Sequence, residues 1–277
     1  MFKKYLQNGL IGATAVVIAG AHLVPGTEQN GPVITAAAHV VAGGDSLRAE
    51  KALKATAVVE HATENLVLLN TNSALSALQA NVRHLSSPKA LEAAFRSYFA
   101  YKAEHPSDVK KPYLYFVDYG LSSTEARGYV FDMDKLEIID GPFTVAHGRG
   151  SSAAQYGIPT RFSNSGGAGT TSLGLYLTQE TYPFSGHAGG GLYHSIGLRL
   201  KGLSGDWNDN ARARGVVAHG APYVTPSKAG RSLGCPAMEQ ARAQRLLPKL
   251  ANGSLVFLFA PVDKWINSDP WIVASTN

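Results

Sequence analysis

Between Tyr113 and Phe259 the apolar residues come in short runs that turn residues separate. Short runs rich in β-branched and aromatic side chains predict β-strands. We expect strands at 113–119, 128–133, 136–139, 143–146, 172–178, 197–200, 216–218 and 254–259. Many short strands with few helices favour a mainly β (α+β) domain, built as a sandwich or a barrel-like sheet.

Helical spacing marks the two flanks of this region. Apolar residues at Leu47, Ala52, Ala55, Val59, Ala62 and Leu66 predict a helical segment over 45–87. Ser87-Pro88 is a helix start signal, and a second helical pattern covers 237–250. We therefore expect a domain over 88–265 behind an N-terminal helical segment, with a C-terminal tail over 266–277.

The first residues have the pattern of a secretory signal peptide over 1–21. Lys3 and Lys4 precede an apolar run from Leu10, and Ala19-Gly20-Ala21 offers a cleavage site. The run is shorter than the roughly 20 apolar residues that cross a bilayer, so no stable membrane span is expected. Residues 22–44, rich in Gly, Ala and Thr, predict a linker. We expect an exported protein of the periplasm or cell-wall space.

Composition changes this picture little. The 277 residues are 45% apolar and 16% charged, which is typical of a globular protein with a core. The net charge of +5 suits an acidic surface such as a cell-wall polymer, or is ordinary surface charge. No run of lysine and arginine indicates nucleic acid. The oligomeric state cannot be read from the sequence.

Cys235 is the only cysteine, and His219 precedes it by sixteen residues (235 − 219). An unpaired cysteine in an exported protein is buried, intermolecular or catalytic. A thiol on a loop that feeds a helix can face the helix N-terminus, which favours a thiolate, and a histidine can take its proton. Gly220 and Gly234 flank the two residues, and the amides of Gly234 and Cys235 can form an oxyanion hole.

Other histidines and acids do not form a metal pattern. His187 and His194 are widely spaced, and Asp206, Asn208 and Asp209 lack the calcium-loop pattern. We expect neither metal nor other cofactor. His147-Gly148 is a second His-Gly pair, but no cysteine follows it at a similar distance.

The sequence from Asn210 to Ala237 resembles the YkuD-type murein L,D-transpeptidases. The string Gly230-Arg-Ser-Leu-Gly-Cys-Pro-Ala237 follows His219-Gly-Ala-Pro-Tyr-Val224, Arg214 and Asn210-Ala211. Further similar segments are Val145–Ser151, Phe162–Asn164, Ser172–Thr178 and Leu198–Leu203. This is the pattern of the branch described as the murein L,D-transpeptidase catalytic domain family, and it covers roughly 88–262.

The resemblance implies an L,D-transpeptidase-like β-sandwich domain that acts on peptidoglycan stem peptides without a cofactor. It implies Cys235 as the nucleophile and His219 as the base, oriented by the carbonyl of Gly220. Ser232 would hold the loop, and His147 and Tyr223 would contact substrate. Arg231 and Arg214 would either contact substrate carboxylates or anchor loops through ion pairs. Better-studied members of the wider group carry an arginine two places after the cysteine, where this chain has Pro236-Ala237.

Three readings of the region stay open at this point. The first is acyl transfer to an amine, which cross-links or remodels the wall. The second is hydrolysis by the same residues, as in an L,D-carboxypeptidase or endopeptidase. The third is a wall-binding module with an inert cysteine.

Overall fold

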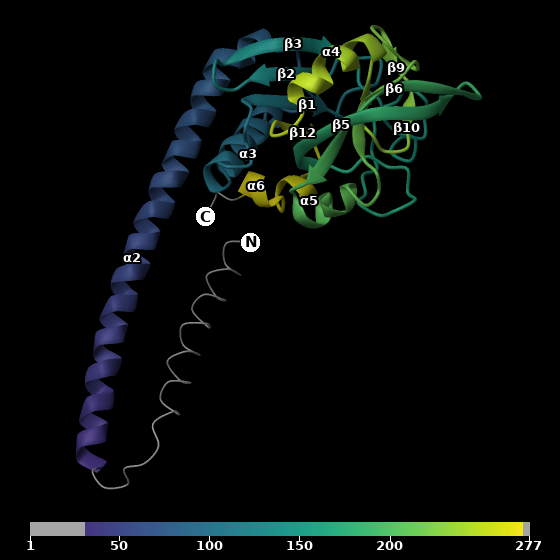
Figure 1. Ribbon diagram of the computed structural model, residues 1–277. Helices are drawn as coiled ribbons and strands as arrows, with labels where there is room; N and C mark the ends of the chain where they lie inside the picture. Colours follow the sequence, from purple (N-terminus) through teal and green to yellow (C-terminus); the bar gives the residue numbers. More distant parts are fainter. Residues whose placement is uncertain (1–30, 274–277) are drawn as a thin grey trace. The chain divides into compact units, whose positions relative to one another are not determined.

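The computed structural model describes residues 31–273, with side chains from Arg48 onward. The chain divides into two units, 1–62 and 63–277. Helix α2 (Gly31–Leu78) is continuous (Figure 1), so residues 31–44 of the expected linker are helical. Runs such as Ala36–Ala38 have high helix propensity, which offsets a cost of about 1 kcal/mol for each of Gly43 and Gly44. The expected signal peptide and residues 22–30 lie outside the described part of the chain.

A mixed sheet of eight strands forms the body of the second unit. Its order is β11-β7-β6-β5-β12-β1-β2-β3, and the pairs β1–β12 and β7–β11 are parallel. This sheet-rich architecture confirms the predicted mainly β (α+β) class. The strands are β1 (Tyr113–Asp118), β2 (Gly128–Asp132), β3 (Glu137–Phe143), β5 (Gly174–Ala188), β6 (Gly191–Gly202), β7 (Val217–Gly220), β11 (Ala237–Met238) and β12 (Leu255–Phe259).

Two short two-stranded pairs lie beside this sheet. They are β4 (His147–Gly148) with β10 (Arg231–Ser232), and β8 (Val224–Thr225) with β9 (Lys228–Ala229). The helical prediction for 237–250 holds only from Gln240, because Ala237 and Met238 pair with β7 instead. Residues 143–146 form no strand of their own: Phe143 ends β3 and Ala146 makes a single bridge to Ala237.

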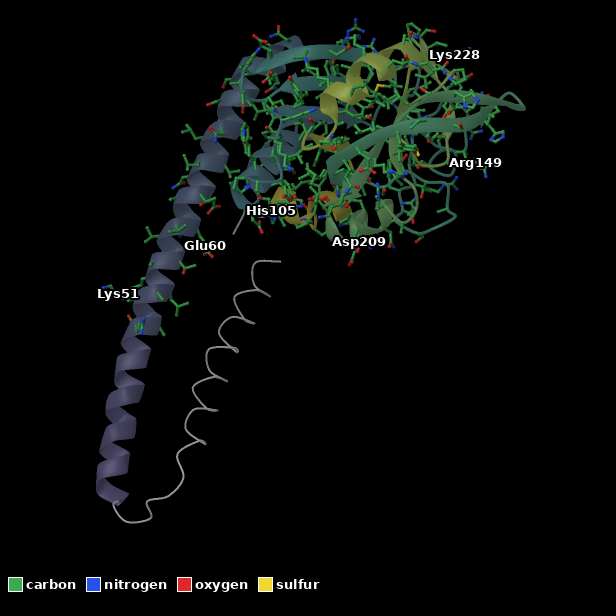
Figure 2. The ribbon with its side chains drawn as sticks, viewed as in Figure 1. Lys51, Glu60, His105, Arg149, Asp209 and Lys228 are labelled. Atoms are coloured by element: carbon green, nitrogen blue, oxygen red, sulfur yellow. The ribbon has the colours of Figure 1, made fainter. Side chains whose placement is uncertain are left out.

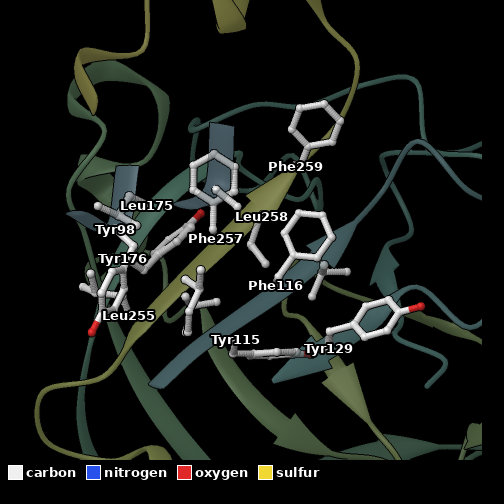
Figure 3. Close-up of a cluster of buried hydrophobic side chains, with 14 of the residues drawn as sticks. Tyr98, Tyr115, Phe116, Tyr129, Leu175, Tyr176, Leu255, Phe257, Leu258 and Phe259 are labelled. Carbon is white, nitrogen blue, oxygen red and sulfur yellow. The ribbon is translucent and has the colours of Figure 1, made fainter. Parts of the chain in front are cut away.

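Helices α3 (Ala90–Glu104) and α4 (Gln240–Leu250) cover opposite faces of the sheet. Side chains alternate along a strand, so neighbours on β1 face opposite ways. Phe116 packs against Phe131, which Phe95 of α3 meets edge-on. Tyr115 stacks on Phe143, over which Arg242 of α4 lies. The buried aromatic and aliphatic cluster of the central strands forms the core (Figure 3).

The expected tail over 266–277 is part of the domain as far as Val273. Helices α5 (Asp263–Ile266) and α6 (Pro270–Val273) follow the last strand. The Trp271 indole donates to the carbonyl of Leu203 at 2.7 Å, and the Trp265 indole donates to buried Asp269 at 2.9 Å. Two large aromatic residues are therefore buried where the sequence pattern is too short to predict a helix.

Strands β5 and β6 form a hairpin much longer than predicted. They pair from Tyr176↔Gly202 to Ala188↔Gly191. The neighbouring strands pair only near the base of this hairpin. Strand β12 pairs with β5 as far as Leu177, and β7 pairs with β6 only from Gly197 to Arg199. The distal half of the hairpin therefore extends beyond the rest of the sheet (Figure 1).

Candidate active site

The loop that carries Cys235 runs from β10 to β11 and is fixed at both ends. The amide of Arg149 donates to the carbonyl of Ser232, and the amide of Ala146 donates to the carbonyl of Ala237, both at 2.8 Å. Strand β11 then pairs with β7 so that Ala237 is the partner of His219. The topology thus brings the cysteine loop beside the strand that ends in the histidine. Arg149 and Lys228, labelled in Figure 2, mark the segments after β4 and at β9 that flank this region.

The Ser232 side chain makes two hydrogen bonds within the loop that carries Cys235. Its hydroxyl donates to the carbonyl of Cys235 at 2.7 Å and accepts the amide of Gly234 at 3.1 Å. The Gly234 amide, expected in an oxyanion hole, is therefore directed to Ser232. Among the described residues no hydrogen bond from the Cys235 amide is found, so this amide is not used within the loop.

Glycine at 234 and 148 allows three segments to meet. Gly234 has φ +130°, and a Cβ there would lie 2.7 Å from the carbonyl oxygen of Thr170. A Cβ on Gly148 would lie 2.9 Å from the Cα of Gly234 and 2.3 Å from the Gly169 oxygen. Backbone packs directly on backbone here, which any larger residue would prevent.

The Cys235 thiol is directed toward the start of β7. It donates to the carbonyl of Gly215 at 3.8 Å, and the residue is partly exposed. Burial raises the pKa of the thiol, while the amide of Val217 and the charge of Arg214 oppose this. The predicted help from a helix N-terminus is wrong, because α4 begins only at Gln240, after β11. The group is therefore a neutral thiol near pH 7, and its reaction requires a base.

His219 lies two residues beyond Val217, so the two side chains share one face of β7. Its Nδ1–H donates to the carbonyl of Gly220 at 3.0 Å. Since a carbonyl only accepts, this bond fixes the tautomer and leaves Nε2 with a free lone pair. Burial lowers the pKa of His219 to about 4, so the imidazole is neutral near pH 7. Within the described residues no direct hydrogen bond joins thiol and imidazole, as is common before substrate binds.

His147 lies in the core. Arg127 is fully buried and donates from Nη2 to Nδ1 of His147 at 2.9 Å. Burial, together with the charges of Arg127 and Arg231, lowers the pKa of His147 to about 3. The ring is on the side of β4 opposite to Gly148, and its exposure is 0%. His147 was expected to contact substrate, but its ring presents no exposed surface for such a contact.

The two arginines expected to contact substrate hold loops. Arg214 donates to the carbonyls of Ser163 and Thr170, each at 2.8 Å. Arg231 donates to the carbonyl of Ser152 at 3.2 Å. Both side chains thus order the segment 149–171. Arg214 is also near enough to the thiol to lower its pKa.

The aromatic surroundings of the histidine were not predicted. Phe184 stacks on His219 with ring centroids 4.2 Å apart, and the Tyr193 hydroxyl is 3.5 Å from Nδ1. Tyr223, predicted from its motif, meets Tyr193 edge-on. The two-residue spacing of the aromatic residues Tyr182 and Phe184 was the signal for a strand there.

The histidines of the hairpin, His187 and His194, and the acids Asp206 and Asp209 form no metal site in the described structure. Among the side chains that the structure describes, no three His, Cys, Asp or Glu groups are placed to hold a metal ion. His194 makes a hydrogen bond with the Ser185 hydroxyl across the hairpin, at 3.0 Å.

Comparison with known proteins identifies the family. The profile described as the L,D-transpeptidase catalytic domain matches residues 83–259 of the 277. The chain belongs to the L,D-transpeptidase catalytic domain family, as its motifs predicted. No curated protein matches the chain at a significant level.

Solved structures similar to the chain are themselves L,D-transpeptidases. One from Xylanimonas cellulosilytica is 13% identical, with 54% of this chain and 61% of that chain covered and a TM-score of 0.33. One from Mycobacterium smegmatis is 14% identical, with 54% and 59% covered and a TM-score of 0.32. L,D-transpeptidase 3 from Mycobacterium tuberculosis is 13% identical, with 53% and 61% covered and a TM-score of 0.31. The match spans about three fifths of their length.

Proposed function

We propose that the protein is an exported cysteine L,D-transpeptidase of the cell-wall space. Its family acts on peptidoglycan, a polymer that lies outside the cytoplasmic membrane. The observation that carries the proposal is the bond from His219 Nδ1 to the Gly220 carbonyl, beside the cysteine loop. That bond leaves Nε2 as the only nitrogen able to accept a proton. None of the helices that the structure describes is long and apolar enough to cross a membrane.

The first half of the reaction forms a thioester. His219 Nε2 accepts the thiol proton while Sγ of Cys235 attacks the carbonyl carbon of the third stem residue. The Cys235 amide donates to the oxygen that gains negative charge. As the intermediate collapses, the C–N bond breaks and His219 returns the proton to the leaving amine. The products are the acyl-enzyme and free D-alanine.

The second half transfers the acyl group to an acceptor. The amine of a second stem peptide attacks the thioester carbon, and His219 takes a proton from the attacking nitrogen. The C–S bond then breaks, and the sulfur regains a proton. Because water competes with the amine, transfer requires that the acceptor be positioned, an effect worth on the order of 7–11 kcal/mol in the best intramolecular models.

The choice between amine and water as acceptor is tested by incubating the protein with a tetrapeptide muropeptide and either a second stem peptide or a D-amino acid. We expect cross-linked or exchanged products, read by mass spectrometry, in amounts that rise with acceptor concentration. If only tripeptide and free D-alanine form at every acceptor concentration, the protein is an L,D-carboxypeptidase instead.

The pH profile of acylation follows from the neutral state of both groups. The pKa of His219 is lowered to about 4, so the base is fully available above about pH 5. Protonation removes it as the pH falls through 4. The raised pKa of the thiol prevents a thiolate-driven increase near neutrality. We expect a nearly constant acylation rate from about pH 5 to 8, measured with a carbapenem. A rate that already falls as the pH is lowered through about 6.5 would contradict the conclusion that His219 and the Cys235 thiol are both neutral.

A further inference from the structure

A row of three strands places the hairpin beside the proposed base. Gly197 of β6 is the cross-strand partner of Tyr182 on one side and of His219 on the other. A Cβ on Gly197 would lie 2.6 Å from an atom of the Tyr182 ring. The missing side chain at Gly197 therefore leaves space that the Tyr182 ring occupies.

Phe184 lies beside the Tyr182 ring and against the imidazole. It follows Tyr182 by two residues, so both face the same side of β5. Its ring lies 6.3 Å from that of Tyr182, 6.1 Å from that of Tyr193 and 4.2 Å from that of His219, centroid to centroid. The angle of 21° to the imidazole plane makes this a stacked contact.

The other side of the His219–Gly220 turn is also filled. A Cβ on Gly220 would lie 2.4 Å from the Ser195 hydroxyl and 2.9 Å from the Ala243 methyl. Ser195 is the cross-strand partner of Phe184. Ser195 and Ala243 thus limit the space at Gly220, whose carbonyl accepts the Nδ1 bond.

From this geometry we propose that Phe184 is a positioning residue: its stacked ring holds the His219 imidazole with Nδ1 on Gly220 and Nε2 free for the Cys235 thiol. The role of His219 as base rests on the proposed function, whereas the hold on its ring does not. Tyr193 from β6 contacts the imidazole, and Tyr223 meets Tyr193 edge-on. Burial raises the pKa values of these two phenols and of the Cys235 thiol, so none of the three is charged near pH 7.

The test compares substitutions at Phe184 with a matched change on the same strand face. Phe184→Leu and Phe184→Met remove the ring but keep much of the volume, whereas Phe184→Tyr keeps the ring. Tyr182→Leu removes a neighbouring ring that contacts Phe184 rather than His219. Each full-length variant is assayed for carbapenem acylation across pH, and its folding is checked by thermal unfolding.

We expect the Leu and Met variants to acylate roughly ten- to a hundredfold more slowly at neutral pH, since small displacements of reacting groups cost this much. Their acid limb should also move up from about pH 4 toward the ordinary imidazole value near 6.5, because the ring is less buried. Phe184→Tyr and Tyr182→Leu should stay within a few-fold of the unchanged protein. Wild-type rates and an unmoved acid limb in the Leu and Met variants, or an equal loss in Tyr182→Leu, would overturn the proposal.

A second measurement does not depend on the reaction. The ¹⁵N shifts of the His219 ring, assigned by their loss in His219→Gln, report its tautomer and pKa. We expect the fixed Nδ1–H form in the unchanged protein, and tautomer exchange with a raised pKa in Phe184→Leu. If the protein acylates nothing, the proposed function fails while this measurement still decides the positioning. Identical ring shifts and an identical His219 pKa in both proteins would overturn the positioning role of Phe184.

Discussion

The Cys235→Ala variant should release no D-alanine from a tetrapeptide muropeptide and form no cross-linked product. Removal of the nucleophile from a comparable serine enzyme costs on the order of 10⁶ in kcat, which is below detection in most product assays. The fold should persist, because the residue is partly exposed and its thiol contacts only backbone groups among the described residues, the Val217 amide and, at 3.8 Å, the Gly215 carbonyl. Product mass spectrometry with the two proteins at equal folded concentration makes the comparison.

Thermal unfolding supplies the control for this variant. A midpoint close to that of the unchanged protein assigns the lost activity to the sulfur. Retention of D-alanine release in folded Cys235→Ala would mean that another residue attacks the stem peptide.

His219→Ala should lose most of the thiol reactivity and His147→Ala should not. Removal of a general base costs typically about 100- to 10,000-fold, because a neutral thiol must lose its proton to react. The readout is the rate of carbapenem acylation. His147 is held in the core by Arg127, so its loss should act on the fold.

The expected result for His147→Ala is a measurable acylation rate in the folded protein and a lower midpoint of unfolding. The free energy of unfolding should fall by about 2–4 kcal/mol, because a cavity forms and a buried Arg127 donor loses its acceptor. Swapped effects of the two substitutions would show that the base is assigned to the wrong histidine.

Much of the domain can be predicted from local patterns. The strand runs at 113–119, 128–133 and 254–259 agree with β1, β2 and β12 to within a residue or two, because buried strands have distinctive apolar runs. The contact between His219 and Gly220 involves chain neighbours, so the motif was enough to indicate it. The resemblance to the L,D-transpeptidase family supplied the expected reaction and the expected roles of Cys235 and His219.

What the sequence could not predict depends on contacts across the chain. Arg127 and His147 are twenty residues apart, and only the finished sheet shows that they bury each other. Phe184 reaches His219 through the register of three strands. The start of α4 was misplaced because Ala237 and Met238 suit a helix locally, yet pairing with β7 determines their conformation.

The intact mass of the protein after an acid quench tests the central claim most directly. Incubated with a tetrapeptide muropeptide, the unchanged protein should gain the donor mass minus that of D-alanine, on the peptide that contains Cys235. Cys235→Ala should gain nothing. The account is contradicted if products accumulate without this adduct at any quench time, or if the same mass gain occurs in Cys235→Ala.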